Sequence, residues 1–285
     1  MGESSVTFHD DIPEHYRNQI VVSDCLDYLR SLPDASVPLF LFSPKYNLGN
    51  TSGGGMPGKK FGHYAPAGGM AVRGGMGKWS GGALAYGYDT DDDNMPHDEY
   101  VAWLGSILHE CWRCLPKNGA IYFNHKPRIL SGVLVEPRDY VPRDLIVRQR
   151  IIWARAGGIN FSPAFYLPTY EEILVIAKLD FRLKSKGASG AGDVWTISQE
   201  TNTWHPAPFP LGLAQRVIET VAPAYICDPF MGRGTTAIAA GLAGIGFLGC
   251  DRSAAYVERA QRDYAYQVER KALESDWAGT LFDLA

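Results

Sequence analysis

Asp-Pro-Phe-Met-Gly-Arg-Gly-Thr-Thr, at positions 228–236, carries the strongest fold signal in this chain. An apolar run at 224–227 precedes it and an alanine-rich segment follows, which predicts a strand, a glycine turn and the N-terminus of a helix. At such a turn the backbone can approach a nucleotide-like ligand closely. Only Gly232 and Gly234 are placed for the dinucleotide fingerprint G-x-G-x-x-G, so the pattern predicts a different cofactor.

Predicted strands and helices alternate along the rest of the chain. Apolar residues recur at helical spacing over 25–32, 100–115, 213–221 and about 253–274. Extended apolar runs, which predict strands, lie at 19–22, 37–42, 120–123, 151–153, 173–177, 194–197 and 246–250. This alternation predicts an α/β fold with a mostly parallel sheet and helices on both faces. Such sheets bind ligands at the carboxyl ends of their strands.

Length and composition fit one α/β domain. Of the 285 residues, 46% are hydrophobic, which is typical of a chain with a full-sized core. We therefore expect a single domain over residues 1–285, with a short basic linker at about 182–192. The first eleven residues do not resemble a signal peptide, and the longest apolar runs are too short to cross a bilayer. We expect a soluble, intracellular protein.

Neither the cysteines nor the acidic residues predict a metal site. The five cysteines are an odd number, which suits reduced thiols. Cys111 and Cys114 form a lone C-x-x-C pair, and the acidic run at 89–93 lacks the spacing of a calcium loop. We expect no metal.

The charge distribution is uneven. The net charge of -4 argues against a protein that coats nucleic acid, but residues 117–186 contain twelve Lys or Arg against six Asp or Glu. This stretch is either an ordinary solvated face or a surface that contacts phosphates.

Residues 49–88 form an insertion of a different character. Glycines and aromatic residues are mixed with Lys and Arg, and no periodicity is present. A segment of this length without periodicity is usually functional or disordered. We expect either a loop that orders on a nucleic-acid backbone or a flexible surface insertion.

Two motifs together resemble those of a known family. Residues 228–236 resemble the S-adenosylmethionine-binding motif of amino-group DNA methyltransferases, and Ser43-Pro44-Lys45-Tyr46-Asn47 resembles their catalytic (Ser/Asp/Asn)-Pro-Pro-(Tyr/Phe) motif. The catalytic motif comes first, as in the β arrangement of the family. The resemblance implies a Rossmann-like methyltransferase sheet, S-adenosylmethionine as cofactor, double-stranded DNA as partner, and a cytoplasmic enzyme of prokaryotic or phage-encoded type.

Several residues are predicted to bind the cofactor. Asp251 stands about 20 residues past the glycine turn, where an acidic residue meets a ribose in Rossmann-like units, or it caps the next helix. The resemblance implies that Asp24 binds the adenine amino group and that Asp228 lies near the amino acid portion. Phe230 would line the cofactor pocket or pack in the core. The full predicted set is Asp24, His205, Phe209, Asp228, Pro229, Phe230, Gly232, Gly234, Thr235, Thr236 and Asp251.

The resemblance also implies the catalytic residues. An exocyclic amine is a poor nucleophile, and Ser43 together with the carbonyl of Pro44 would accept its two protons. Tyr46 would stack on a base flipped out of the duplex, and Asn47 would bond the base edge or the backbone. Serine at position 43 favours cytosine N4 over adenine N6 as the target.

Two departures from the family pattern matter. Lys45 replaces the usual proline, which loosens the turn but places a cation near a DNA phosphate. A DNA-binding homologue that has lost catalysis is therefore an alternative, and an RNA or protein amide methyltransferase is another.

The second departure is the short span between Lys178 and Trp195, where enzymes that this chain resembles often insert a sizeable target-recognition region. We expect residues 49–88 to read the DNA instead, with Lys59, Lys60, Arg73 and Lys78 on phosphates. The sequence does not determine whether the protein forms a homodimer, which DNA sequence it recognises, or whether a restriction nuclease accompanies it.

Overall fold

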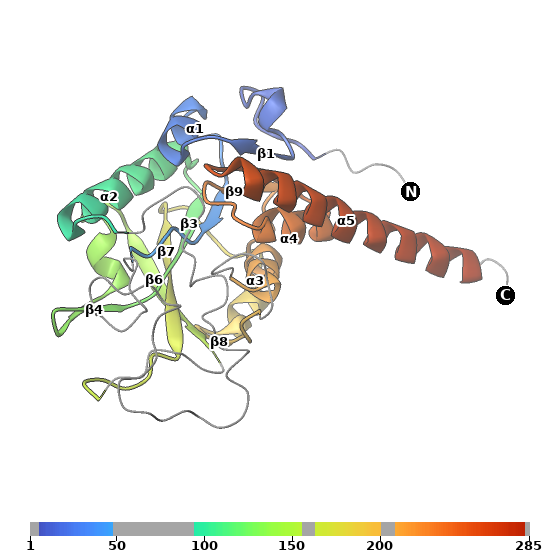
Figure 1. Ribbon diagram of the computed structural model, residues 1–285. Helices are drawn as coiled ribbons and strands as arrows, with labels where there is room; N and C mark the ends of the chain where they lie inside the picture. The colour runs from blue at the N-terminus through green and yellow to red at the C-terminus, as the bar shows by residue number, and fades with distance from the viewer. Residues whose placement is uncertain (1–5, 48–93, 156–162, 201–208, 283–285) are drawn as a thin grey trace.

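A computed structural model describes residues 6–47, 94–155, 163–200 and 209–282 of this chain, apart from the side chains of 269 and 272–282. Within these ranges the protein is built on an eight-stranded sheet with the order β1-β10-β9-β2-β3-β7-β6-β8 (Figure 1). The strands are β1 (Gln19–Val22), β2 (Leu39–Phe42), β3 (Ala120–His125), β6 (Val147–Ala154), β7 (Tyr170–Ala177), β8 (Val194–Thr196), β9 (Tyr225–Asp228) and β10 (Gly246–Asp251).

One strand of this sheet runs against the others. β7 pairs antiparallel with both β3 and β6, and the other neighbouring pairs are parallel. The predicted mostly parallel sheet is confirmed. The reversal of β7 is a finding of the structure, because apolar periodicity predicts where a strand lies and not its direction.

In the part of the chain that the structure describes, five α-helices cover the sheet: α1 (Cys25–Ser31), α2 (His97–Cys114), α3 (Leu211–Val221), α4 (Thr235–Ala243) and α5 (Ala254–Phe282). Side chains of β2 alternate between them. Phe40 and Phe42 pack in the core under α1 and α2, whereas Leu39 and Leu41 pack in the core under α3, α4 and α5. All four are fully buried, as expected for a strand covered on both faces. Figure 1 shows the two groups of helices on opposite sides of the sheet, which confirms that prediction.

Smaller elements and one helix end differ from the sequence predictions. A hairpin of β4 (Arg128–Leu130) and β5 (Val133–Val135) follows β3, and short 3-10 helices lie at Glu14–Tyr16, Pro137–Tyr140 and Gly187–Ala191. α5 continues past residue 274, where the sequence predicted its end, since no proline interrupts 275–282. In Figure 1 its last turns extend beyond the sheet and the other helices.

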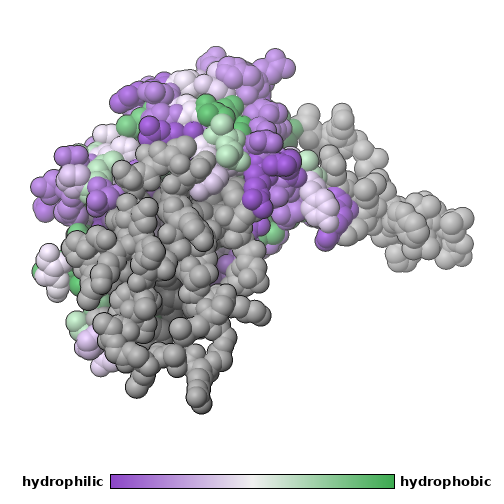
Figure 2. Space-filling view, in the orientation of Figure 1, coloured by the Kyte–Doolittle hydropathy of each residue, from purple (hydrophilic) through white to green (hydrophobic). Residues whose placement is uncertain are grey.

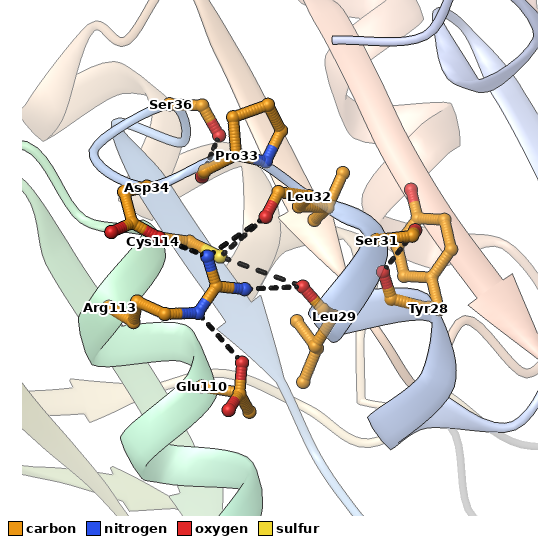
Figure 3. A network of polar contacts seen from close by, with 10 residues as sticks. All are labelled: Tyr28, Leu29, Ser31, Leu32, Pro33, Asp34, Ser36, Glu110, Arg113 and Cys114. Carbon is orange, nitrogen blue, oxygen red and sulfur yellow. Dashed lines mark hydrogen bonds and ion pairs between the residues drawn. The ribbon is translucent and has the colours of Figure 1, made fainter. Parts of the chain in front are cut away.

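Arg113, near the end of α2, holds the end of α1 (Figure 3). Its guanidinium donates to the carbonyls of Leu29 at 2.9 Å and Leu32 at 3.0 Å, and to the carboxylates of Glu110 at 2.8 Å and Asp34 at 2.5 Å. The last carbonyls of a helix have no partners within it, and a cation there also favours the helix dipole. The contacts therefore fix α1 in place.

The five cysteines are all buried and form no disulfide. Burial raises the pKa of Cys25 to about 12, so its thiol keeps its proton. The described residues contain no group of three or more His, Cys, Asp or Glu that would hold a metal ion. In the same ranges, no helix is both long and apolar enough to span a membrane. The first half of α5 presents a largely hydrophilic surface (Figure 2).

Candidate functional site

The glycine turn follows β9 as predicted, and Asp228 anchors it. This side chain is 1% exposed, and its carboxylate accepts hydrogen bonds from the backbone N–H of Phe230 at 2.9 Å and from Thr236 Oγ1 at 2.7 Å. Burial, together with the smaller effect of the nearby Asp251 charge, raises the pKa of Asp228 to about 7. A buried carboxylate of this kind favours a positively charged ligand.

The turn requires glycine at two positions. Gly232 and Gly234 have φ of 51° and 84°, and a Cβ at Gly234 would lie 3.1 Å from the Cβ of Ala260 in α5. Beneath the turn, a Cβ at Gly249 in β10 would lie 2.0 Å from Met231 Cε and 2.7 Å from the Asp228 carbonyl. The turn therefore packs directly on the neighbouring strand.

Carboxylates also follow β10, which neighbours β9, and β1, which lies beyond β10 in the sheet. Asp251, at the end of β10, accepts from the N–H groups of Gly232 at 2.8 Å and Ser253 at 2.9 Å. Asp251 thus supports the turn and the residue that precedes α5. The helix cap, predicted as its alternative role, is supplied by Ser253, whose Oγ accepts from the N–H of Tyr256 at 3.2 Å. Asp24, after β1, uses Oδ1 to cap α1 through Leu26 and Asp27. β1, β10 and β9 each lead to an acidic side chain at one edge of the sheet.

A further ion pair ties the turn to α3. Arg233 Nη1 lies 2.5 Å from Glu200 Oε2, and the other oxygen of Glu200 accepts from the N–H of Leu211 at 2.8 Å. Phe209, two residues before α3, is 7% exposed and packs in the core. His205 lies outside the described residues, so its predicted contact with the cofactor stays a prediction.

The second motif lies beside the first. Ser43 follows β2, which pairs with β9 through Phe40 and Cys227 and with β3 along its whole length. Phe230 of the glycine turn packs against Phe42, with ring centroids 5.6 Å apart, and against Trp103 of α2 at 5.7 Å. Phe230 therefore contributes to the core on this side. The two motifs, far apart in the chain, meet at the carboxyl edge of adjacent strands.

A buried polar network surrounds Ser43 and Tyr46. Ser43 Oγ and Tyr46 Oη are 2.6 Å apart, and Tyr46 Oη lies 2.8 Å from Glu171 Oε2 on β7. Asn124 Nδ2 on β3 is 2.7 Å from Tyr46 Oη, 2.9 Å from Glu171 Oε2 and 3.3 Å from Ser43 Oγ. Glu171 forms an ion pair with Arg155 at 3.0 Å. Residues on β3 and β7 and residues that follow β2 and β6 thus supply one hydrogen-bonded cluster.

Lys45, which stands in place of the family's proline, is held by aromatic residues. Its carbonyl accepts a hydrogen bond from Tyr100 Oη at 2.5 Å, and its ammonium lies 5.4 Å from the ring centroid of Trp103. Tyr100 Oη is also 2.9 Å from His125 Nε2. Burial lowers the pKa of His125 to about 3, so the ring is neutral at physiological pH. The turn is therefore anchored without a proline at position 45.

The contacts of Tyr46 and Asn47 within the protein bear on the roles predicted for them at the flipped base. The Tyr46 ring is 8% exposed and packs against His125, with centroids 4.6 Å apart, so stacking on a base stays a prediction. Asn47 has φ of 52°, and its side-chain amide both donates to the Met95 carbonyl at 2.7 Å and accepts from the Met95 N–H at 2.6 Å. It joins the two ends of the 48–94 segment. Lys59, Lys60, Arg73 and Lys78 lie outside the described residues.

The sequence did not single out Asn124, Arg155, Glu171, Glu200 or Gly249 as site residues. One signal was available for Asn124 and Glu171. Both are polar side chains in mostly apolar strands, and their exposed fractions are 0% and 6%. A buried polar group requires partners, which marks such positions as functional or structural centres.

A model of the N6/N4 methyltransferase family, described as DNA methylase, matches residues 37–262 and so includes both motifs. The chain belongs to this DNA methylase family. The methylase is 25% identical to the type II methyltransferase M.BglII of Bacillus subtilis, over 90% of this chain and 70% of that protein. It is 20% identical to the DNA adenine methyltransferase YhdJ of Escherichia coli, over 88% of this chain and 84% of that protein.

Solved structures share the fold of the methylase. The cytosine-N4-specific PvuII DNA methyltransferase gives a TM-score of 0.61 at 15% identity, with 90% of this chain and 89% of that chain covered. TTHA0409 of Thermus thermophilus, a putative DNA modification methylase complexed with S-adenosyl-L-methionine, gives 0.56 at 21% identity, with 88% and 94% covered. The Rossmann-like methyltransferase fold predicted from the sequence is thereby confirmed.

Proposed function

We propose that this DNA methylase transfers a methyl group from S-adenosylmethionine to the exocyclic amine of a base flipped out of double-stranded DNA. One observation carries the proposal: the Ser43–Asn47 motif and the glycine turn after Asp228 lie at the ends of adjacent strands, β2 and β9. A methyl donor held at one strand end would face an amine held at the other. Family membership supports DNA as the substrate.

The residues at the edge of β1, β10 and β9 fit S-adenosylmethionine. Its adenine amine, ribose hydroxyls and ammonium are hydrogen-bond donors, and Asp24, Asp251 and Asp228 are acceptors in the matching order. Asp24 uses only Oδ1 to cap α1, and each oxygen of Asp228 accepts one hydrogen bond within the described residues. A carboxylate oxygen accepts about two hydrogen bonds, so capacity remains for a ligand. When bound, the cofactor supplies an electrophilic methyl group.

The chain also offers acceptors for the amine protons. Ser43 Oγ lies at the end of β2, and within the described ranges no group donates a hydrogen bond to the carbonyl of Pro44. Two acceptors that bind the amine protons would concentrate the nitrogen lone pair toward the methyl donor. This supports Ser43 and Pro44 as catalytic residues.

Cytosine N4 is the favoured target, because serine stands at position 43. The similar proteins include a cytosine-N4-specific enzyme and an adenine methyltransferase, so both bases occur among them. The test is mass spectrometry of nucleosides from mixed-sequence DNA incubated with the protein and S-adenosylmethionine. We expect N4-methylcytosine. N6-methyladenine would change the base assignment, and the absence of both would overturn the proposed activity.

A second candidate, a DNA-binding homologue without catalysis, is motivated by Lys45. The hydrogen bond from Tyr100 Oη to the Lys45 carbonyl orders the turn in another way, which supports the active enzyme. No observation favours an RNA or protein substrate.

We also propose that residues 49–88 read the DNA, since this segment follows the catalytic motif and the chain on its two sides is joined by the Asn47 amide and Met95. Replacing Lys59, Lys60, Arg73 and Lys78 with alanine should weaken DNA binding and reduce its salt dependence, while S-adenosylmethionine binding is unchanged. DNA titrations at several salt concentrations check this. An unaltered salt slope would remove these four cations from the DNA interface.

A further inference from the structure

The proposed catalytic arrangement uses the oxygen of Ser43, but it gives no task to Glu171 and none to the hydroxyl of Tyr46. We propose that Glu171 is a positioning residue: it sets the direction of the hydrogen-bond chain Ser43–Tyr46–Glu171, so that Ser43 presents lone pairs and not its proton to the substrate amine. This inference rests on the proposed function. It is carried by the balance of donors and acceptors in the buried network.

The balance begins at Glu171, which only accepts hydrogen bonds. Its Oε1 lies 3.0 Å from Arg155 Nη1 in an ion pair whose two side chains are 7% and 11% exposed. A carboxylate paired with a guanidinium is ionised and has no proton to give. Oε2, at 2.8 Å from Tyr46 Oη, must therefore receive the phenol proton.

The next group is the Tyr46 hydroxyl, which has a single proton. Because this proton goes to Glu171, the two other short contacts of the oxygen must come from donors. One is Asn124 Nδ2 at 2.7 Å, whose amide is oriented with its NH₂ group toward the Glu171 carboxylate at 2.9 Å. The other is Ser43 Oγ at 2.6 Å, so the serine hydroxyl donates to Tyr46.

The direction at Ser43 follows. Asn124 has two amide protons, and its two nearest acceptors, Tyr46 Oη and Glu171 Oε2, take them, while Ser43 Oγ lies farther away at 3.3 Å. Ser43 has given its only proton to Tyr46 and keeps its lone pairs. In the opposite direction of the chain, Ser43 would point its proton at the amine and repel it. The negative charge of Glu171, at one end of this hydrogen-bond chain, determines which of the two directions is adopted.

Glu171→Gln tests this directly, because Arg155 also orients the new side chain. The guanidinium requires an acceptor, so the glutamine carbonyl should face Arg155 and the NH₂ group should face Tyr46. That NH₂ group would also meet Asn124 Nδ2, which lies 2.9 Å from Glu171 Oε2, so the Asn124 amide must turn its oxygen toward the new donor. Tyr46 would then accept from Gln and have either Asn124 or Ser43 as acceptor for its own proton, so the direction of the hydrogen bond at Ser43 is no longer fixed. We expect the single-turnover rate of methyl transfer to fall by about a hundredfold, the scale for loss of one preorganised hydrogen bond at a reacting group. The affinities for S-adenosylmethionine and DNA should change less than about twofold.

Two further variants separate positioning from a structural role. Glu171→Asp keeps the acceptor and the charge and should recover part of the rate. Tyr46→Phe keeps the ring and the Arg155–Glu171 ion pair but removes the link, so it should also slow methyl transfer at unchanged donor affinity. In a double-mutant cycle, Glu171→Gln should cost little more in the Tyr46→Phe background, since both break one chain. This second variant keeps the test valid if Glu171→Gln is poorly folded.

The outcomes are distinct. Normal single-turnover rates in Tyr46→Phe and in folded Glu171→Gln would overturn the positioning role, as would fully additive effects of the two changes. A wild-type protein that methylates no DNA would instead overturn the proposed function, before any variant is compared.

Discussion

Single residues at the glycine turn link sequence to chemistry most directly. No sequence pattern marks Gly249 as a site residue, yet the turn packs directly against it. The Asp228 carbonyl and the Met231 side chain occupy the space that a Cβ would need. Asp228 in turn holds both sides of the turn through Phe230 and Thr236. The backbone that is predicted to approach the donor is therefore set by contacts from two strands.

Gly249→Ala should displace the turn, because the new Cβ would lie 2.7 Å from a backbone oxygen that cannot move independently. We expect a loss of about 1–3 kcal/mol in unfolding free energy, the range for overpacking, and weaker donor binding. Gly105→Ala in α2 is the matched control, since its Cβ would meet only Pro142 Cγ at 3.6 Å. Denaturant unfolding and calorimetric titration of S-adenosylmethionine measure both. Equal behaviour of the two variants would contradict the close packing at Gly249.

Donor binding should depend on pH through Asp228. Burial raises its pKa to about 7 in the absence of donor, and a positively charged ligand favours the carboxylate. Binding then releases a proton, so affinity rises as pH increases through about 7, by about tenfold between about pH 6 and about pH 8. Asp228→Asn should bind more weakly and without this dependence. Titrations across that range check the prediction, and a flat wild-type profile would refute it.

At the scale of elements, α1 and α2 are joined by one side chain. Arg113 of α2 satisfies carbonyls at the end of α1, while Asp24 caps the beginning of α1 beside the predicted donor site. The position of Asp24 therefore depends on a helix whose other end is bound by Arg113, a residue about 80 positions later in the sequence.

Arg113→Met should lower the unfolding free energy by about 2 kcal/mol, because two carbonyls lose donors and two partly exposed ion pairs are broken. Arg30→Met is the control. Arg30 is 59% exposed and lies 3.7 Å from Asp27, so we expect a change below about 0.5 kcal/mol. Thermal or denaturant unfolding of both variants makes the comparison. Similar losses in the two variants would show that the contacts of Arg113 contribute little more to stability than a surface ion pair.

At the scale of the whole molecule, the sheet brings together two half-sites with different tasks. The edge of β1, β10 and β9 presents the carboxylates that we propose bind the methyl donor, and the edge of β2, β3 and β7 presents the network around Ser43. Phe230 packs against Phe42 where the two halves meet. We therefore expect substitutions in each half to affect different steps.

Tyr46→Ala should lose turnover with near-normal donor affinity, whereas Asp251→Ala should weaken donor binding by about tenfold or more, since it also releases the N–H of Gly232. Asp251→Asn, which keeps an acceptor, should have the smaller effect of the two changes at that position. Calorimetric donor titrations paired with single-turnover methylation distinguish the steps. Equal effects of Tyr46→Ala and Asp251→Ala on donor affinity would undo the division between the half-sites.

Much of this architecture could be predicted from local patterns. The strand, glycine turn and helix around 228–236 lie where the sequence places them, and the Ser43 motif follows a buried strand as expected. Apolar periodicity and glycine placement act between neighbours in the chain, so they are readable there. Residues 49–88 and His205, by contrast, lie outside the described ranges and remain predictions.

The order of elements, the two motifs and the family resemblance are thus properties of the sequence by itself. The reversal of β7 and the cluster of Asn124, Arg155 and Glu171 around Tyr46 were decided by tertiary structure alone. Tyr46 and Glu171 are 125 residues apart, and their strands are separated by β3 in the sheet. A hydrogen bond of that separation leaves no local pattern, because its geometry exists only once three strands have paired and excluded water.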